Sequence, residues 1–294
     1  MKLWKHHGAK KEAQQMDEIA KKRGEDWLSF YGGKVSSEWM IPKILETLHE
    51  APQVYQEADR FLEALDWIIW YLTDTEICSA CGAGYKAFHR HDSGYPSVDF
   101  FRELDPRLEH VVEEKLNAPL KTVGECAGGL CIRMANVLGL RPGTPVAAGI
   151  IDAHASVPGC QISEPGTMML IIGTSSCHLM LSETEAGITG VGGLVKDGIL
   201  PGYFGYEAGQ CCVGDLFGWF VKNGVPERYH QEAREKDLSL HQLLTEKIKD
   251  YRAGQSGLLA LDWFNGVRSP LMDFDLNGMI LGMNLRTKPE EIYL

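Results

Sequence analysis

The chain has 294 residues, with 44% hydrophobic and 23% charged side chains and a formal net charge of −11 at pH 7. This composition is ordinary for a globular protein, and the length suits two domains. The negative net charge argues against a surface that binds nucleic acid or an anionic membrane. It does not exclude a phosphorylated ligand, because such a ligand needs only a local group of hydrogen-bond donors.

The N-terminal sequence and the cysteines predict a cytoplasmic protein. The first residues, MKLWKHHGAKKEAQQ, are basic and lack the apolar core of a signal peptide, and no run reaches the ~20 apolar residues of a membrane span. Eight cysteines are scattered along the chain, which favours reduced thiols over a disulfide scaffold. Cys78 and Cys81 have the spacing of half a zinc site, but no second pair follows, so we expect no metal site.

The first half of the chain is predicted to be mainly helical. Residues 38–49 and 58–72 carry apolar side chains at intervals of three and four, as amphipathic helices do. A polar loop is expected over residues 88–99. Residues 130–138 predict a short helix that ends at Gly139.

The pattern changes after the turn cluster Arg141-Pro-Gly-Thr-Pro145, which we interpret as a domain boundary. A strand is expected over residues 146–151. The apolar runs 167–172 and 177–181 are joined by the turn Gly173-Thr-Ser-Ser176, so they predict a β-hairpin. Beyond the hairpin we expect a flexible loop over 202–210, helices over 209–222 and 238–250, and a helix start at Thr287 with Pro289 in its first turn.

The hairpin turn is a candidate for binding phosphate. A glycine lets the backbone approach a ligand closely, and consecutive N–H groups beside hydroxyls can form an anion nest. Turns of this composition also occur as plain connections between strands.

Asp152 and His154 stand where the expected strand 146–151 stops. The carboxyl edge of a strand is where open α/β sheets place ligand groups, and an aspartate there could take a proton from a hydroxyl during phosphoryl transfer. The alternative is that Asp152 caps the following helix. We interpret His154 as a positioned hydrogen-bonding residue rather than a catalyst.

Two further residues could bind a ligand. Glu207 lies in Gly202-Tyr-Phe-Gly-Tyr-Glu-Ala-Gly-Gln210, whose mixture of glycine, aromatic and polar residues suits a polyhydroxylated ligand, although Glu207 could equally cap a helix. Lys86 lies among small residues in AGYKA, and a lone lysine is most often a solvated surface residue.

The order of these motifs is similar to that of the FGGY carbohydrate kinases, and the residues resemble the ribulokinase branch of that family. The resemblance covers essentially the whole chain and is carried by YGGKVSSEWMIPKILE, AGYKAFH, GIIDAHASVPG, GTMMLIIGTSSCHLMLS, PGYFGYEAGQCCVGDLFGWFV and SGLLALDWFNGVRSP. It implies an α/β fold of the actin-like (ribonuclease H-like) ATPase class, with two domains around a cleft. Residues 1–144 would be the C-terminal part of the first domain, on the sugar-binding side, and residues 145–294 the N-terminal part of the second.

The resemblance also implies an activity, namely ATP-dependent phosphorylation of L-ribulose to L-ribulose 5-phosphate in arabinose breakdown. Asp152 matches the catalytic base and contacts the sugar, and Lys86 and Glu207 match sugar-binding residues. The positions that match nucleotide-binding loops are Gly173, Thr174, Ser175, Asn265 and Gly266. Magnesium is expected to arrive with ATP. Residues 4–7 match a segment that borders the sugar pocket, and the resemblance leaves self-association into a homo-oligomer open.

The chain departs from the family pattern at both ends. It lacks an initial Asp-x-Gly-Thr phosphate hairpin and a final Gly-Gly adenosine loop, so we expect both domains to be incomplete and the chain to be a fragment with little activity of its own. Two alternatives stay open. One is an inactive fragment or pseudokinase that keeps sugar binding, and the other is a kinase for a different pentulose or polyol, such as xylulose, glycerol or ribitol.

Overall fold

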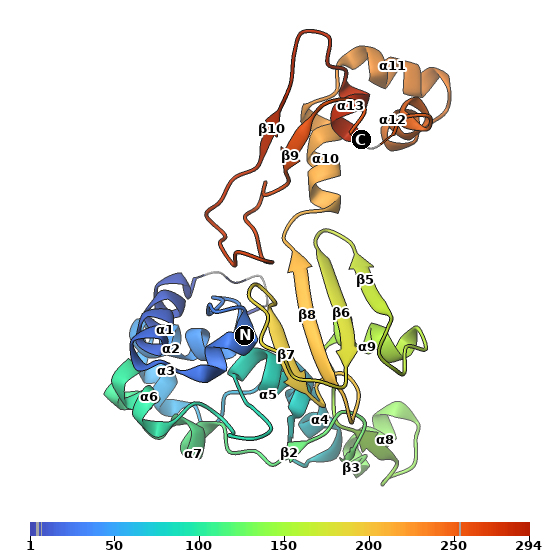
Figure 1. The fold of residues 1–294 in the computed structure, drawn as a ribbon. Helices are drawn as coiled ribbons and strands as arrows, with labels where there is room; N and C mark the ends of the chain where they lie inside the picture. The colour runs from blue at the N-terminus through green and yellow to red at the C-terminus, as the bar shows by residue number, and fades with distance from the viewer. Residues whose placement is uncertain (4–5, 7, 253) are drawn as a thin grey trace. The chain divides into compact units, whose positions relative to one another are not determined.

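The computed structural model describes residues 1–3, 6, 8–252 and 254–294, so most of the segment 4–7 lies outside the described residues (Figure 1). The chain divides into two compact units. The first contains residues 1–170 and 178–208, and the second contains residues 171–177 and 209–294. The predicted division into 1–144 and 145–294 follows the domains of the family that the sequence resembles, whereas these units are defined by internal contacts. That division stays a prediction.

The first unit contains most of the helices. They are α1 (Lys10–Arg23), α2 (Met40–Glu50), α3 (Pro52–Glu57), α4 (Ala64–Thr73), α5 (Ala80–Ala87), α6 (Val98–Leu104), α7 (Val111–Lys115), α8 (Ile132–Leu138) and α9 (Asp152–Gly159), with short 3-10 helices at Asp26–Tyr31 and Pro106–Leu108. The predicted helices 38–49 and 130–138 are confirmed as α2 and α8, and Gly139 ends α8 in the left-handed conformation. The helix predicted over 58–72 begins only at Ala64, because the Phe61 N–H is bound to the Lys115 carbonyl.

The main sheet has four strands in the order β5-β6-β8-β7. They are β5 (Met168–Ile172), β6 (Ser176–Ser182), β7 (Gly193–Lys196) and β8 (Phe204–Gln210). The predicted hairpin is confirmed, since β5 and β6 are neighbours joined by residues 173–175. Strands β7 and β8 are antiparallel, with Glu207 opposite Gly193. The ends of β5, β6 and β8 nearest the turn 173–175 belong to the second unit.

Two sequence-based expectations about strands are wrong. Residues 202–210 are not a flexible loop, because most of them form β8. The glycines at positions 205 and 209 are uncommon in strands, so the sequence pattern did not indicate one. The strand expected over 146–151 is only β4 (Pro145–Ala147), which pairs with β3 (Cys126–Gly129). Just beyond it the Ala148 N–H still binds the Glu125 carbonyl, but the Gly149 carbonyl and the Ile151 N–H bind side chains, so the pairing does not continue to residue 151. The remaining pair, β1 (Cys78–Ser79) and β2 (Leu120–Lys121), is parallel.

The helices of the second unit pack around an apolar core. Its elements are α10 (Gly214–Asn223), α11 (Glu227–Glu235), α12 (Leu240–Ile248), the antiparallel pair β9 (Leu259–Leu261) and β10 (Met279–Leu281), and α13 (Pro289–Tyr293). The core includes Phe220, Tyr229 and Leu243. Helix α13 has Pro289 in its first turn, as predicted, but Lys288 rather than Thr287 is its N-cap. The Thr287 hydroxyl instead accepts a hydrogen bond from the Asn284 N–H.

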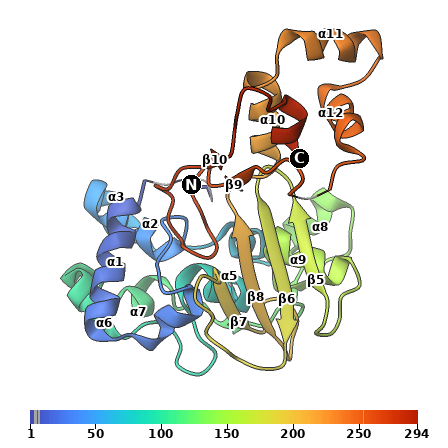
Figure 2. The ribbon, with the colours of Figure 1, turned by 45° about the horizontal axis from the view of Figure 1, so that its top comes forward.

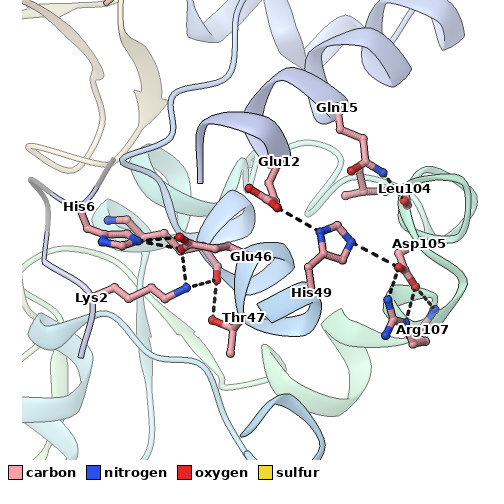
Figure 3. Close-up of polar contacts among 11 residues, drawn as sticks. Lys2, His6, Glu12, Gln15, Glu46, Thr47, His49, Leu104, Asp105 and Arg107 are labelled. Carbon is pink, nitrogen blue, oxygen red and sulfur yellow. Dashed lines mark hydrogen bonds and ion pairs between the residues drawn. The ribbon is translucent and has the colours of Figure 1, made fainter. Parts of the chain in front are cut away.

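Buried carboxylates join the N-terminal segment to α2, as Figure 3 shows. Glu46 on α2 is only 2% exposed, and its carboxylate lies 2.5 Å from Lys2 Nζ and 2.9 Å from His6 Nε2. On the next turn of α2, His49 Nδ1 lies 3.1 Å from Glu12 Oε1 on α1. Burial alone would raise the pKa of Glu46, but the hydrogen bonds and charges of Lys2 and His6 outweigh it, so the pKa is lower than usual.

We expect Glu46→Gln to destabilise the chain at neutral pH by about 1–3 kcal/mol, because the substitution removes the charge of a buried carboxylate that is hydrogen-bonded to Lys2 and His6. A carboxylate whose pKa is lowered by folding contributes stability above its unfolded pKa, and this contribution is lost as pH falls through the folded pKa. The difference in melting temperature between wild type and Glu46→Gln should therefore shrink from pH 7 to pH 3. Glu164→Gln, at an exposed carboxylate, is the control. An equal difference at both pH values would contradict this account.

Candidate active site

Helix α5 packs closely against β7 because its sequence is made largely of small residues (Figure 2). A Cβ added to Gly84 would overlap the side chain of Val195 on β7. The helix begins at Ser79, whose Oγ accepts a hydrogen bond from the Cys81 N–H at 3.2 Å. This capping fixes the start of the helix that carries Lys86.

Tyr85 anchors α5 to β8. Its ring is 1% exposed, and its hydroxyl donates a hydrogen bond to the Gly205 carbonyl at 2.8 Å. Glycines surround the ring: a Cβ at Gly193 or Gly198 would lie 2.6 or 2.8 Å from ring carbons, and one at Gly205 would overlap the hydroxyl. Burial raises the pKa of Tyr85 well above its usual value, so the hydroxyl keeps its proton and remains a donor.

Asp152 is held at the start of α9 by two contacts from α5. The Ser79 hydroxyl donates to the Gly149 carbonyl at 2.6 Å, and the Ile151 N–H donates to Cys81 Sγ at 3.4 Å. Ile151, not Asp152, is the N-cap of α9, so the helix-cap interpretation of Asp152 is wrong. Asp152 is exposed and stands in the first helical turn, where the helix dipole favours a carboxylate.

Glu207 lies on β8, two residues after the glycine that receives the Tyr85 hydroxyl. Its Oε2 atom is 3.2 Å from Nε2 of His154, and the His154 ring stacks on Tyr85 with ring centroids 4.3 Å apart. The helix-cap interpretation of Glu207 is therefore wrong as well.

Lys86 follows Tyr85 on α5 and is half-buried, so the expectation for an ordinary surface lysine does not hold. The pKa of the Cys81 thiol responds to the charged groups near that thiol. Burial raises the pKa of that thiol to about 12, the Ile151 N–H and Lys86 oppose the rise, and Glu207 adds to it. The three residues predicted for the sugar side thus stand on α5, α9 and β8 of the first unit, elements joined by direct contacts.

The sequence analysis missed the residues that build this arrangement. Asp66 on α4 is 2% exposed and accepts a hydrogen bond from the Ser79 N–H at 2.8 Å. Together with Ser79, Cys81 and Tyr85 it ties α4, α5, α9 and β8 together. The run of small residues around Tyr85 was the available signal, because such a run indicates a helix that approaches another backbone closely.

The turn Gly173–Ser175 rests on the start of α10, within the second unit. The N–H groups of Val213 and Gly214 donate to the carbonyls of Thr174 and Gly173, each at 2.9 Å. A Cβ on Gly214 would lie 2.6 Å from the Gly173 oxygen. The turn therefore lies at the positive end of a helix dipole with Thr174 exposed, and its carbonyls occupy the N–H groups of residues 213 and 214.

Asn265 and Gly266 belong to a second loop of the same unit. Gly266 has a φ of +75°, and a Cβ there would lie 2.5 Å from the Phe274 backbone, so the turn requires glycine. Asn265 is exposed. The loop is tied to the end of β8, since the Ser269 N–H donates to the Gly209 carbonyl at 3.1 Å.

Across the described ranges, no group of three or more histidine, cysteine, aspartate or glutamate side chains is arranged to hold a metal ion. All eight cysteines are free thiols. No helix in the described part of the chain is both long enough and apolar enough to cross a membrane.

The sequence is similar to those of bacterial ribulokinases. A model of the C-terminal domain of the FGGY family of carbohydrate kinases matches residues 168–294. The chain is 53% identical over 293 residues to a ribulokinase from Geobacillus thermodenitrificans and 45% identical to one from Staphylococcus aureus. These alignments cover 100% of this chain but 52% and 53% of the two relatives. The chain therefore spans about half the length of the curated relatives it matches.

Solved structures show the same fold. A xylulose kinase from Rhodospirillum rubrum superposes with a TM-score of 0.75 at 22% identity, covering 94% of this chain and 54% of that one. A ligand-bound xylulose kinase from Lactobacillus acidophilus gives a TM-score of 0.76 at 16% identity, covering 99% and 55%. The fold is that of the FGGY carbohydrate kinases, in the actin-like ATPase class. Within that class, the chain is homologous over its whole length to bacterial ribulokinases, which confirms the resemblance seen in the sequence.

We expect Gly84→Ala to destabilise the chain by about 1–3 kcal/mol, because its new methyl group overlaps Val195 in a packed core. The better helix propensity of alanine, worth up to about 1 kcal/mol, offsets only part of this loss. Gly218→Ala in α10 is the matched control, since a Cβ there meets nothing within 4 Å and should stabilise the chain. The melting temperatures of wild type and of the two variants measure these changes. A Gly84→Ala chain as stable as wild type would contradict the close packing of α5 on β7.

The buried Asp66 makes stability depend on pH. Burial raises its pKa to about 7, so the folded chain keeps a proton that the unfolded chain releases near pH 4. Folding stability should therefore fall as pH rises from about 4 to 7. Asp66→Asn, which is neutral at every pH and can still accept from Ser79, should remove this part of the dependence. Melting curves of both chains between pH 4 and 8 measure it, and an unchanged slope in Asp66→Asn would rule out this assignment.

Proposed function

We propose that this chain carries the sugar side and a phosphate-binding turn of an ATP-dependent kinase that converts L-ribulose to L-ribulose 5-phosphate. One observation carries the proposal. Asp152, Lys86 and Glu207, predicted as base and sugar ligands, stand on elements that Ser79, Cys81 and Tyr85 of one helix tie together. The 53% identity to a ribulokinase over the whole chain favours L-ribulose over another pentulose.

In this proposal Asp152 is the general base. Its exposed carboxylate takes the proton of a sugar hydroxyl while that oxygen attacks the γ-phosphorus of ATP. The new oxygen–phosphorus bond forms as the bond to the bridging oxygen breaks, and ADP leaves. Lys86 and Glu207 hold the other hydroxyls, the lysine as donor and the carboxylate as acceptor, and so orient the reacting one.

The turn Gly173–Ser175 fits nucleotide phosphates. The turn lies against the start of α10 with Thr174 exposed, so the Thr174 hydroxyl is proposed to donate to a phosphate near the positive end of that helix. Asn265 and Gly266 are proposed to border the same nucleotide. Magnesium bound to ATP would neutralise phosphate charge, and it would be brought by the nucleotide. The place of this reaction in arabinose breakdown, in the cytoplasm, stays a prediction.

The sugar-binding part of the proposal can be tested by calorimetry with L-ribulose. We expect binding to the wild-type chain, and losses of about 10- to 100-fold in Lys86→Ala and Glu207→Gln, because each removes a hydrogen bond to a charged group. Lys222→Ala, at an exposed lysine of the second unit, is the control and should bind as wild type does. Equal losses in the control, or no binding to the wild-type chain, would contradict the proposal.

The catalytic part can be tested by measuring ADP formed from radiolabelled Mg-ATP at excess protein, with and without L-ribulose. We expect L-ribulose-dependent ADP release that falls about 100-fold or more in Asp152→Asn, the size of a general-base contribution, while sugar affinity is kept. If Asp152→Asn left the rate of ADP release unchanged, Asp152 would not be the general base. Sugar binding without any release would instead support the alternative of a non-catalytic sugar-binding protein.

A further inference from the structure

His154 is a buried imidazole beside a proposed sugar ligand. It lies on α9, is 1% exposed, and stacks on the Tyr85 ring with an interplanar angle of 27°. Its Nε2 atom is 3.2 Å from Oε2 of Glu207, close enough for an ion pair but outside the geometry of an aligned hydrogen bond. Its Nδ1 atom has no hydrogen-bond partner among the described residues.

Packing does not explain a histidine at this position. A phenylalanine would fill the same space against Tyr85 without burying two ring nitrogens, and burying a polar atom without a good partner costs about 1–3 kcal/mol. The ring cannot turn freely to improve its contacts, because Tyr85 is itself fixed by Gly205 and by close glycines on both sides. The nitrogen facing Glu207 is therefore the feature that distinguishes histidine from an apolar side chain here.

We propose that His154 is a positioning residue for Glu207. In its Nε2–H tautomer the ring places its N–H dipole 3.2 Å from one carboxylate oxygen, Oε2, and so favours the orientation of Glu207 in which the other oxygen can accept from a sugar hydroxyl. The Glu207 side chain is 15% exposed and His154 lies beneath it at 1%, so His154 acts through the carboxylate and does not touch the sugar. This inference rests on the proposed function, in which Glu207 binds L-ribulose.

Substitutions that separate the ring from its nitrogens test the proposal. His154→Phe keeps the stacking and removes the donor, so we expect an unchanged or higher melting temperature and an affinity for L-ribulose about tenfold lower. His154→Gln places an N–H near the Nε2 position and should restore part of that affinity. His49→Phe, at a histidine that bridges α2 to α1, is the control: it should lower the melting temperature and leave the affinity unchanged.

A double-mutant cycle shows whether His154 acts through Glu207. In a Glu207→Ala background, His154→Phe should change the affinity less than twofold. A full tenfold loss in that background, or no loss in the wild-type background, would overturn the proposal.

A measurement without sugar separates this inference from the proposed function. Nitrogen-15 spectra of the histidine rings in the ligand-free chain should show His154 with its proton on Nε2, and that resonance should shift in Glu207→Ala. If L-ribulose does not bind at all, the proposed function fails, and the spectra alone decide whether His154 holds Glu207. A proton on Nδ1, or no shift, would overturn the positioning role.

Discussion

The arrangement of the candidate site residues in the first unit depends on the packing of the Tyr85 ring among glycines. Buried aromatic rings contribute strongly to packing, but a ring on a short helix reaches a neighbouring strand only if both backbones leave room. Gly193, Gly198 and Gly205 provide that room, and the Gly205 carbonyl receives the hydroxyl. Because Lys86 follows Tyr85, Glu207 follows Gly205 by two residues and His154 stacks on the ring, one side chain sets the places of the others.

The two compact units supply opposite kinds of chemistry. The first offers carboxylates and a lysine, which suit sugar hydroxyls. The second offers an exposed threonine in a turn beside a helix start, which suits phosphate oxygens. The turn Gly173–Ser175 is held in place by the Gly173 N–H, which donates to the Ser175 carbonyl, and by the N–H groups of residues 213 and 214, which donate to its other two carbonyls. In phosphoryl transfer, where positioning and electrostatic stabilisation supply most of the rate, such rigid local arrangements matter more than any single reactive group.

The elements that were predicted correctly from the sequence are those defined by local patterns of apolar and turn residues. Helix α2 and the hairpin around residues 173–175 follow from the spacing of apolar residues and from turn chemistry, and both are present. Strand β8 escaped prediction because its glycines serve contacts distant in sequence: Gly205 leaves room for the Tyr85 hydroxyl, and Gly209 leaves room for the Ser176 carbonyl. The early end of β4 has a similar cause, since Ser79 takes the Gly149 carbonyl from 70 residues away. The roles proposed for Asp152, Lys86 and Glu207 came from family resemblance, because isolated polar residues have no periodic pattern from which a role could be predicted.

Two buried titratable groups, Asp66 and His154, lower the stability of the fold around α5. Asp66 supports Ser79 and, through it, the loop that leads to Asp152, while His154 lies beneath Glu207. Each group is almost fully buried, and an apolar residue of similar shape would avoid the free-energy cost of removing it from water. Burial of polar groups at such places is understandable if they fix the direction of a neighbouring functional group rather than strengthen the fold. The two groups flank α5, the helix that carries Lys86. These two buried polar residues therefore lie next to residues proposed to bind the ligand, as expected where stability is exchanged for a defined binding geometry.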